Sequence, residues 1–161
     1  MSVKTKLEFK RVLIVDDETD VLETLGLLLS MCDVVKANNF EDAKVKLETE
    51  HFDIAILDIM GVDGYELLNI AKERNIIAVM LTAHALSPDD IVKAFKKGAA
   101  SYIPKDEIVN ITTFLVDVVE GVEQGKSPWW RWYERLACFF EKRFGPDWQN
   151  KEREFWRKFP Y

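Results

Sequence analysis

The sequence is poor in the residues and segments that define several large classes of protein. Its 161 residues include only two histidines and two cysteines, Cys32 and Cys138. Two cysteines are too few for a disulfide framework, so we expect free thiols in a reducing compartment. The uninterrupted apolar runs, such as residues 12–15 and 76–81, have the length of strands and are far shorter than a membrane span. No basic segment followed by an apolar stretch opens the chain, and we therefore expect a cytoplasmic protein.

Charge and aromatic residues are unevenly distributed along the chain. Residues 1–126 have a net charge of −9, whereas residues 127–161 have a net charge of +3 and contain 12 of the 19 aromatic residues, including all five tryptophans. Such a change of composition is typical of a boundary between structural units. We expect one domain over residues 1–126 and an aromatic-rich helical extension over residues 127–161.

Short apolar runs alternate with helical periodicity through the first part of the chain. We expect strands at residues 11–15, 33–37, 53–57, 77–81 and 101–103, and a helix after each, the last from about residue 106 to 124. Apolar strands linked by helices pair in parallel and are covered on both faces. The sequence therefore predicts an α/β fold with a five-stranded, doubly wound parallel sheet, followed by C-terminal helices.

Polar residues follow four of the predicted strands where each one ends. They are Asp16 and Asp17, then Asp58, Thr82 and Lys105. Ligands of doubly wound sheets bind beyond the carboxyl ends of the strands, so we expect these side chains to converge. Three carboxylates repel one another unless a cation joins them, and Mg²⁺ prefers such oxygen ligands. A carboxylate nucleophile, a metal ion, an ammonium and a hydroxyl are the groups that phosphoryl transfer to an aspartate requires.

The sequence resembles the receiver domain of bacterial two-component response regulators. The resemblance covers roughly residues 10–125 and rests on four motifs: LIVDDE at 13–18, ILDIM at 56–60 with DG at 63–64, LTAH at 81–84, and GAASYIPK at 98–105. It implies a flavodoxin-like (βα)5 fold. The order and spacing of all four motifs make the resemblance specific, although no single motif is.

The resemblance implies a role for each residue of the predicted site. Asp58 is expected to accept a phosphoryl group from a histidine kinase or a phosphotransfer protein. Asp17 is expected to bind Mg²⁺ directly and Asp16 mainly through water, with the backbone carbonyl of Met60 as a further ligand. Lys105 is expected to pair with the phosphoryl oxygens.

Two further residues are implied to act as a switch. Thr82 is expected to rotate toward the phosphoryl group, and Tyr102 to fill the space that it leaves. The surface of the fourth helix, fifth strand and fifth helix would change as a result, which makes this face a candidate for homodimerisation or for binding an unknown output protein. His84 could influence attack of water on the aspartyl phosphate, or have no such task.

Two features depart from the family pattern. The loop IMGVDG at residues 59–64 is two residues shorter than usual. It lacks the proline that the family usually has about four residues after the phosphoacceptor, and has Gly61 instead. Pro104 precedes Lys105, whereas the family commonly has the proline after the lysine. The first departure bears on the position of the metal-binding carbonyl, and the second bears on the geometry of the Lys105 peptide.

The extension lacks the pattern and the length of a DNA-binding output domain. Aromatic residues recur at helical spacing after Ser127-Pro128, where we expect a helix to start, and Gly145-Pro146 ends it before a second short helix. No helix-turn-helix pattern occurs, so we expect no binding to nucleic acid. The aromatic stripe could pack on the receiver or on its copy in a dimer, or bind another protein. Membrane binding is the weakest alternative.

The residues favour a phosphoacceptor switch over an enzyme with its own substrate. The alternative is a receiver-like interaction module that does not turn over phosphate and acts through its C-terminal helices. A Mg²⁺-dependent phosphatase with an aspartate nucleophile requires a second acid two residues beyond Asp58, and Met60 occupies that position.

Overall fold

Parallel strands alternate with helices through most of the chain, as the sequence predicts. The computed structural model describes residues 6–83, 88–150 and 153–159. The strands are β1 (Arg11–Val15), β2 (Asp33–Ala37), β3 (Ile54–Asp58), β4 (Ile77–Thr82) and β5 (Ser101–Pro104). The helices are α2 (Thr19–Leu28), α3 (Phe40–Thr49), α4 (Gly64–Glu73), α5 (Pro88–Lys96), α6 (Ile111–Glu123), α7 (Trp132–Phe144) and α8 (Arg153–Arg157), with a 3₁₀ helix, η1 (Lys105–Asn110), before α6.

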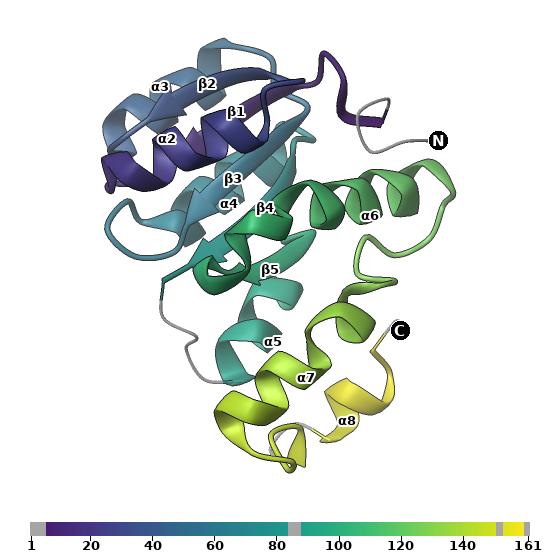
Figure 1. Cartoon of the computed structure of the whole chain (residues 1–161). Helices are drawn as coiled ribbons and strands as arrows, with labels where there is room; N and C mark the ends of the chain where they lie inside the picture. The colour runs from purple at the N-terminus through teal and green to yellow at the C-terminus, as the bar shows by residue number, and fades with distance from the viewer. Residues whose placement is uncertain (1–5, 84–87, 151–152, 160–161) are drawn as a thin grey trace.

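The sheet has the strand order β2-β1-β3-β4-β5, and all neighbouring strands are parallel. Helices α2 and α6 cover one face, and α3, α4 and α5 lie on the other (Figure 1). This is the doubly wound, flavodoxin-like arrangement, in which the strand order reverses between β1 and β3. The predicted fold class is confirmed.

Burial explains why the central strands are continuous apolar runs. All five residues of β3 are buried, as are four of the five in β1, because helices cover both faces of the sheet. The edge strand β2 has two exposed and two partly buried residues and ends on a buried alanine. The core therefore lies around β1, β3 and β4.

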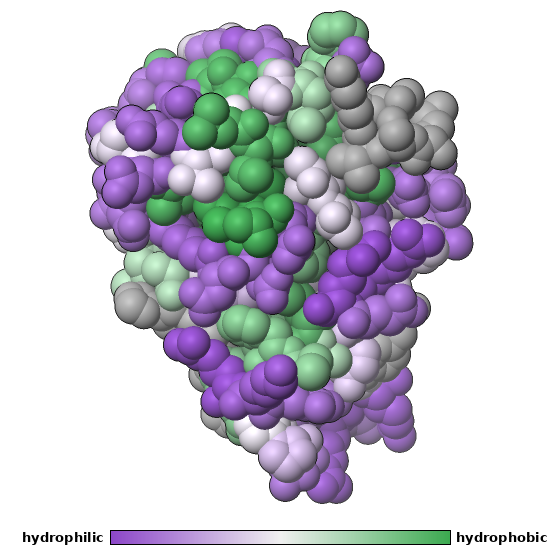
Figure 2. Space-filling model, viewed as in Figure 1, coloured by the Kyte–Doolittle hydropathy of each residue, from purple (hydrophilic) through white to green (hydrophobic). Residues whose placement is uncertain are grey.

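The face of the molecule drawn in Figure 2 carries both polar and apolar regions. In the view of Figure 2, apolar residues gather over the side of the domain where α2 lies, whereas the lower end, which carries α7 and α8, is mainly hydrophilic. Among the described residues, no helix has the length and apolar character that crossing a membrane would require.

The predicted helix over residues 106–124 is correct from Ile111 onward and wrong in its first turn. Residues Lys105–Asn110 form the 3₁₀ helix η1, none of its residues is buried, and regular α-helix begins at Ile111. Core packing fixes α6, whose inner face buries Phe114, Leu115 and Val118. Without such packing, the preceding segment adopts the tighter 3₁₀ form that is common at helix ends.

The predicted helix start at Ser127-Pro128 is also wrong. Helix α7 begins at Trp132, and residues 128–131 form a turn. In this turn the Ser127 hydroxyl accepts a hydrogen bond from the backbone N–H of Trp129. The indoles of Trp129 and Trp130 then bond to different parts of the domain, which draws the chain out of helical geometry.

The C-terminal helices pack on the α/β domain beside α5 and β5 (Figure 1). Phe95 of α5 contacts the rings of Trp129, Phe155 and Phe159 at centroid distances of 5.1 to 5.4 Å. The aromatic stripe of the extension therefore faces the α/β domain of its own chain in this structure. The division of the chain after residue 126 remains a prediction.

Candidate functional site

Four strand ends bring the predicted site residues to one edge of the sheet. Asp16 directly follows β1 and Asp58 is the last residue of β3, so these two carboxylates flank the point where the strand order reverses. Thr82 ends β4, and Lys105 directly follows β5. Parallel strands point their carboxyl ends the same way, which is why residues far apart in the sequence meet here.

Lys105 is the positive centre of this edge. Its Nζ atom lies 2.7 Å from Asp16 Oδ2, 3.6 Å from Asp58 Oδ1 and 3.4 Å from Glu18 Oε1. The lysine side chain is only 11% exposed, and both aspartates are buried. An ammonium in a partly dehydrated position, held by carboxylates, is poised to interact with further oxyanions.

Burial and mutual repulsion disfavour the negative charges of the aspartates at this edge, and Lys105 acts against both effects. Burial, together with the carboxylates of Asp16 and Asp17, raises the pKa of Asp58 to about 7, and Lys105 offsets only part of the effect. Burial likewise raises the pKa of Asp16, against the hydrogen bonds from Lys105 and from the backbone N–H of Glu18. Burial disfavours the charge on Lys105, yet Asp16, Asp58 and Glu18 outweigh it and raise the pKa of the lysine.

An additional cation would relieve this repulsion. Carboxylate oxygens of Asp16, Asp17 and Glu18 lie within 4.8 Å of one another, and such a set of hard oxygen ligands suits Mg²⁺. The raised pKa of Asp58 shows that one lysine does not compensate the negative charge of this edge. The residues present therefore fit a divalent ion. Glu18 was not assigned a role from the sequence, although its place beside two aspartates is a usable signal.

The shortened loop after β3 passes directly over Asp17. Gly61 has a φ of +84°, and a Cβ atom on it would lie 2.5 Å from Asp17 Oδ2. A Cβ on Gly64 would lie 2.1 Å from the backbone oxygen of Asp58. Two glycines thus let a short loop fold tightly against the acidic residues, which sequence spacing alone does not reveal.

Met60 lies in this loop with its side chain 59% exposed, whereas Val62 is buried. The metal-binding role of the Met60 carbonyl remains a prediction.

The two predicted switch residues are buried near the same edge. Thr82 and Tyr102 are each 1% exposed. Thr82 pairs in register with Pro104 of β5, one residue before Lys105. Their predicted roles in a conformational change remain predictions, and His84 lies outside the described residues.

The backbone of Tyr102 has a partner that sequence reasoning missed. Its carbonyl accepts a hydrogen bond of 2.8 Å from the indole of Trp132 in α7. The extension thus contacts the strand that leads to Lys105.

A family model named "Response regulator receiver domain" matches residues 12–114. The heme response regulator HssR of Staphylococcus aureus is 35% identical over 113 residues, which cover 66% of this chain and 50% of HssR. The two-component response regulator ARR10 of Arabidopsis thaliana is 33% identical over 117 residues, which cover 66% of this chain and 21% of ARR10. The chain thus spans half or less of the length of these curated relatives.

Solved structures agree with the sequence comparisons. A CheY-like response regulator receiver domain from Methanospirillum hungatei JF-1 superimposes with a TM-score of 0.60 at 30% identity, covering 70% of this chain and 98% of that one. The response regulator DrrB of Thermotoga maritima superimposes with a TM-score of 0.61 at 26% identity, covering 74% of this chain and 55% of that one. The chain belongs to the response regulator receiver domain family of two-component signalling.

Proposed function

We propose that this chain is a phosphoacceptor switch in which Asp58 receives a phosphoryl group from a sensor histidine kinase or a phosphotransfer protein. Receiver domains of response regulators interact with such donors. The observation that carries the proposal is the buried Asp58 carboxylate at the end of β3, facing Lys105 and the acidic cluster of Asp16 and Asp17.

The proposed transfer divides the work among residues of four strand ends. A carboxylate oxygen of Asp58 attacks the phosphorus of a phosphohistidine, the new O–P bond forms as the P–N bond breaks, and the imidazole leaves with the bonding electron pair. Lys105 and the Thr82 hydroxyl stabilise the charge on the phosphoryl oxygens. Asp16, Asp17 and Asp58, with the Met60 carbonyl, would hold Mg²⁺, which supplies the further neutralisation of charge that phosphoryl transfer requires.

We propose that output proceeds by conformational change and contact with another protein, without binding to nucleic acid. The extension supports this proposal, because its two helices present aromatic residues to the domain and a mainly hydrophilic surface outward (Figure 2). Thr82 and Tyr102 are the proposed switch residues. Residues 1–126 would form the receiver and 127–161 the extension, in a protein of the cytoplasm.

One observation favours the alternative of an interaction module that does not turn over phosphate. The loop at residues 59–64 is short, and it packs so closely on Asp17 that a Cβ atom added at Gly61 would lie 2.5 Å from Asp17 Oδ2. The buried pair of Lys105 and Asp58 supports the phosphoacceptor instead. Met60 still argues against an aspartate-based phosphatase.

Incubation with Mg²⁺ and acetyl phosphate, followed by intact mass measurement, distinguishes these functions. The proposal predicts a species heavier by about 80 Da, the mass of one phosphoryl group, which disappears with EDTA and in the Asp58→Asn variant. A chain that stays unmodified would support the interaction module.

A further inference from the structure

The extension covers one continuous face of the receiver, formed by α5, β5 and α6. Strand β5 is the last in the sheet, and its outer edge would otherwise leave backbone groups unpaired. The indole of Trp132 donates to the Tyr102 carbonyl of this strand at 2.8 Å. The indole of Trp129 donates to the Ala99 carbonyl just before the strand, at 2.7 Å. Both indoles are almost fully buried. The extension therefore acts as an edge cap, and not as a loosely attached tail.

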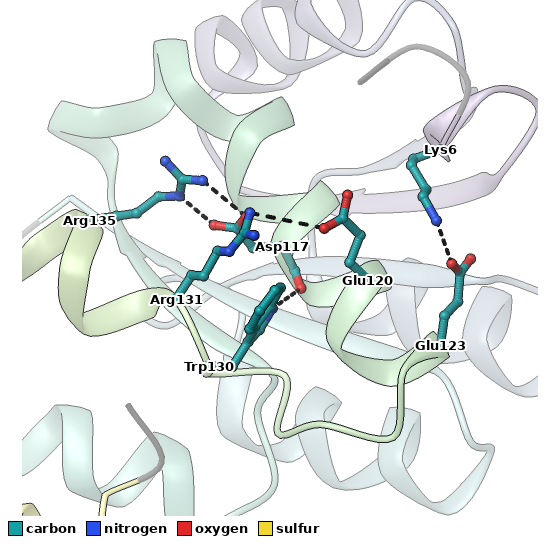
Figure 3. Close-up of polar contacts among 7 residues, drawn as sticks. All are labelled: Lys6, Asp117, Glu120, Glu123, Trp130, Arg131 and Arg135. Carbon is teal, nitrogen blue, oxygen red and sulfur yellow. Dashed lines mark hydrogen bonds and ion pairs between the residues drawn. The ribbon is translucent and has the colours of Figure 1, made fainter. Parts of the chain in front are cut away.

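A partly buried ion pair, with a buried carboxylate, fixes the extension to α6 (Figure 3). Asp117 lies in an otherwise apolar stretch of α6 and is 5% exposed. Arg135 donates to its carboxylate from Nε and from Nη2, and Arg131 Nη1 lies 3.6 Å from Oδ1. The Trp130 indole donates to the backbone carbonyl of Asp117 at 2.9 Å. The buried Asp117 carboxylate has both of its arginine partners in the extension. This pairing favours one position of the extension along α6.

The same strand connects this cap to the acidic site. Lys105 contacts Asp58 and Asp16, and the next residue, Asp106, lies 3.9 Å from Arg143 of α7. Tyr102, only three residues earlier, carries the carbonyl that Trp132 holds. One end of β5 is thus attached to the site, and its outer edge is attached to the extension.

We propose that the C-terminal extension is a self-docked cap on the α5–β5–α6 face and that phosphorylation of Asp58 weakens its docking. This inference rests on the proposed function. Phosphorylation replaces the Asp58 carboxylate, which carries a charge of at most −1, with an acyl phosphate of about −2, and this draws the Lys105 ammonium away from Asp16 and Glu18. The movement of Lys105 displaces the backbone at the end of β5. The extension is complementary to β5 in its position before phosphorylation, so this displacement weakens docking. Linkage requires the reciprocal effect, so the docked extension opposes phosphorylation.

The tryptophans provide a direct measurement of docking. All five belong to the extension, so tryptophan fluorescence reports on this segment alone. We would measure acrylamide quenching before and after treatment with Mg²⁺ and acetyl phosphate, with intact mass determined on the same samples. The quenching constant is expected to rise at least about twofold, because the buried indoles of Trp129 and Trp132 are bonded to the α/β domain when the extension is docked. The Asp58→Asn variant is expected to show no rise.

The outcomes separate this inference from the proposed function. A phosphorylated chain whose quenching is unchanged or decreased would overturn the cap and leave the phosphoacceptor standing. A chain that takes no phosphoryl group would overturn both.

A pair of conservative variants tests the reciprocal effect. Trp132→Phe keeps an aromatic ring and removes the N–H donated to Tyr102. Trp148→Phe is the matched control, because the rings around Trp148 are those of Tyr133, Phe140 and Trp156, all within the extension. We would measure the steady-state ratio of phosphorylated to unmodified protein. Relative to the unaltered chain, this ratio is expected to rise about twofold or more in Trp132→Phe only. Equal ratios in both variants and the unaltered chain would contradict coupling through β5.

Discussion

The Asp58 carboxylate should destabilise the fold in metal-free buffer, and replacing it should therefore stabilise the protein. Its pKa is raised from an ordinary value of 3.8 to about 7 by burial and by the neighbouring carboxylates. The folded state then holds a proton that the unfolded state releases, so stability falls as pH rises from about 4 to about 7. Each pKa unit corresponds to about 1.4 kcal/mol, which gives a cost of up to about 4 kcal/mol at pH 8 and about 2 kcal/mol at pH 5.

The Asp58→Asn variant removes the charge with little change of shape. In EDTA, its free energy of unfolding, measured by urea denaturation, should exceed that of the unaltered chain at both pH values. The difference should be about 2.5 kcal/mol larger at pH 8 than at pH 5. Asp147→Asn, which alters an exposed carboxylate in the extension, should change neither value by more than about 0.5 kcal/mol.

Addition of Mg²⁺ at pH 8 provides the second part of this measurement. The unaltered chain should gain about 1.4 kcal/mol at a concentration ten times the dissociation constant, and Asp58→Asn should gain less. A variant that is less stable than the unaltered chain at pH 8, or a difference that does not change with pH, would refute the electrostatic description of this site.

Two further substitutions test the shortened loop and the anchor of the extension. Gly61→Ala should weaken Mg²⁺ binding, measured by calorimetry, at least about tenfold, because the new Cβ would lie 2.5 Å from Asp17 Oδ2. Gly125→Ala, at a φ of +70° with open space around it, carries similar backbone strain and should leave the affinity unchanged. Arg135→Ala should lower the free energy of unfolding by about 1 to 3 kcal/mol, because Asp117 remains buried with a weaker partner.

The arginine prediction has its own matched control. Arg157 pairs with Glu154 where both side chains are about 70% exposed, and Arg157→Ala should cost less than about 0.5 kcal/mol in the same denaturation assay. Equal losses in the two arginine variants would show that the Asp117 pair is not an anchor. Equal Mg²⁺ affinities of the two glycine variants would show that the loop does not crowd Asp17.

The fold and the convergence of the site followed from simple features of the sequence. Each strand is a short apolar run, and the parallel arrangement requires their carboxyl ends to meet at one edge. Asp16, Asp58 and Lys105 could therefore be grouped from the order of strands and helices alone, although they are up to 89 residues apart. Their distances in the structure agree with that grouping.

The errors arose where contacts between distant residues decide local structure. The helix expected from Ser127 starts at Trp132, because indoles in the preceding turn bond to Ala99 and Asp117. The path of Gly61 over Asp17 depends on loop geometry that spacing does not encode. A usable signal did exist in α6, where a single aspartate interrupts an apolar stripe and indicates a buried ionic partner.

Chemical mapping of the phosphorylated residue tests the proposed function most directly. An aspartyl phosphate is reduced by borohydride to homoserine, whereas a free carboxylate is not. After treatment with Mg²⁺ and acetyl phosphate, peptide mapping should find homoserine at position 58 and unaltered aspartate at positions 16 and 17. Homoserine at another aspartate, or none in the chain, would contradict the assignment of Asp58 as the phosphoacceptor.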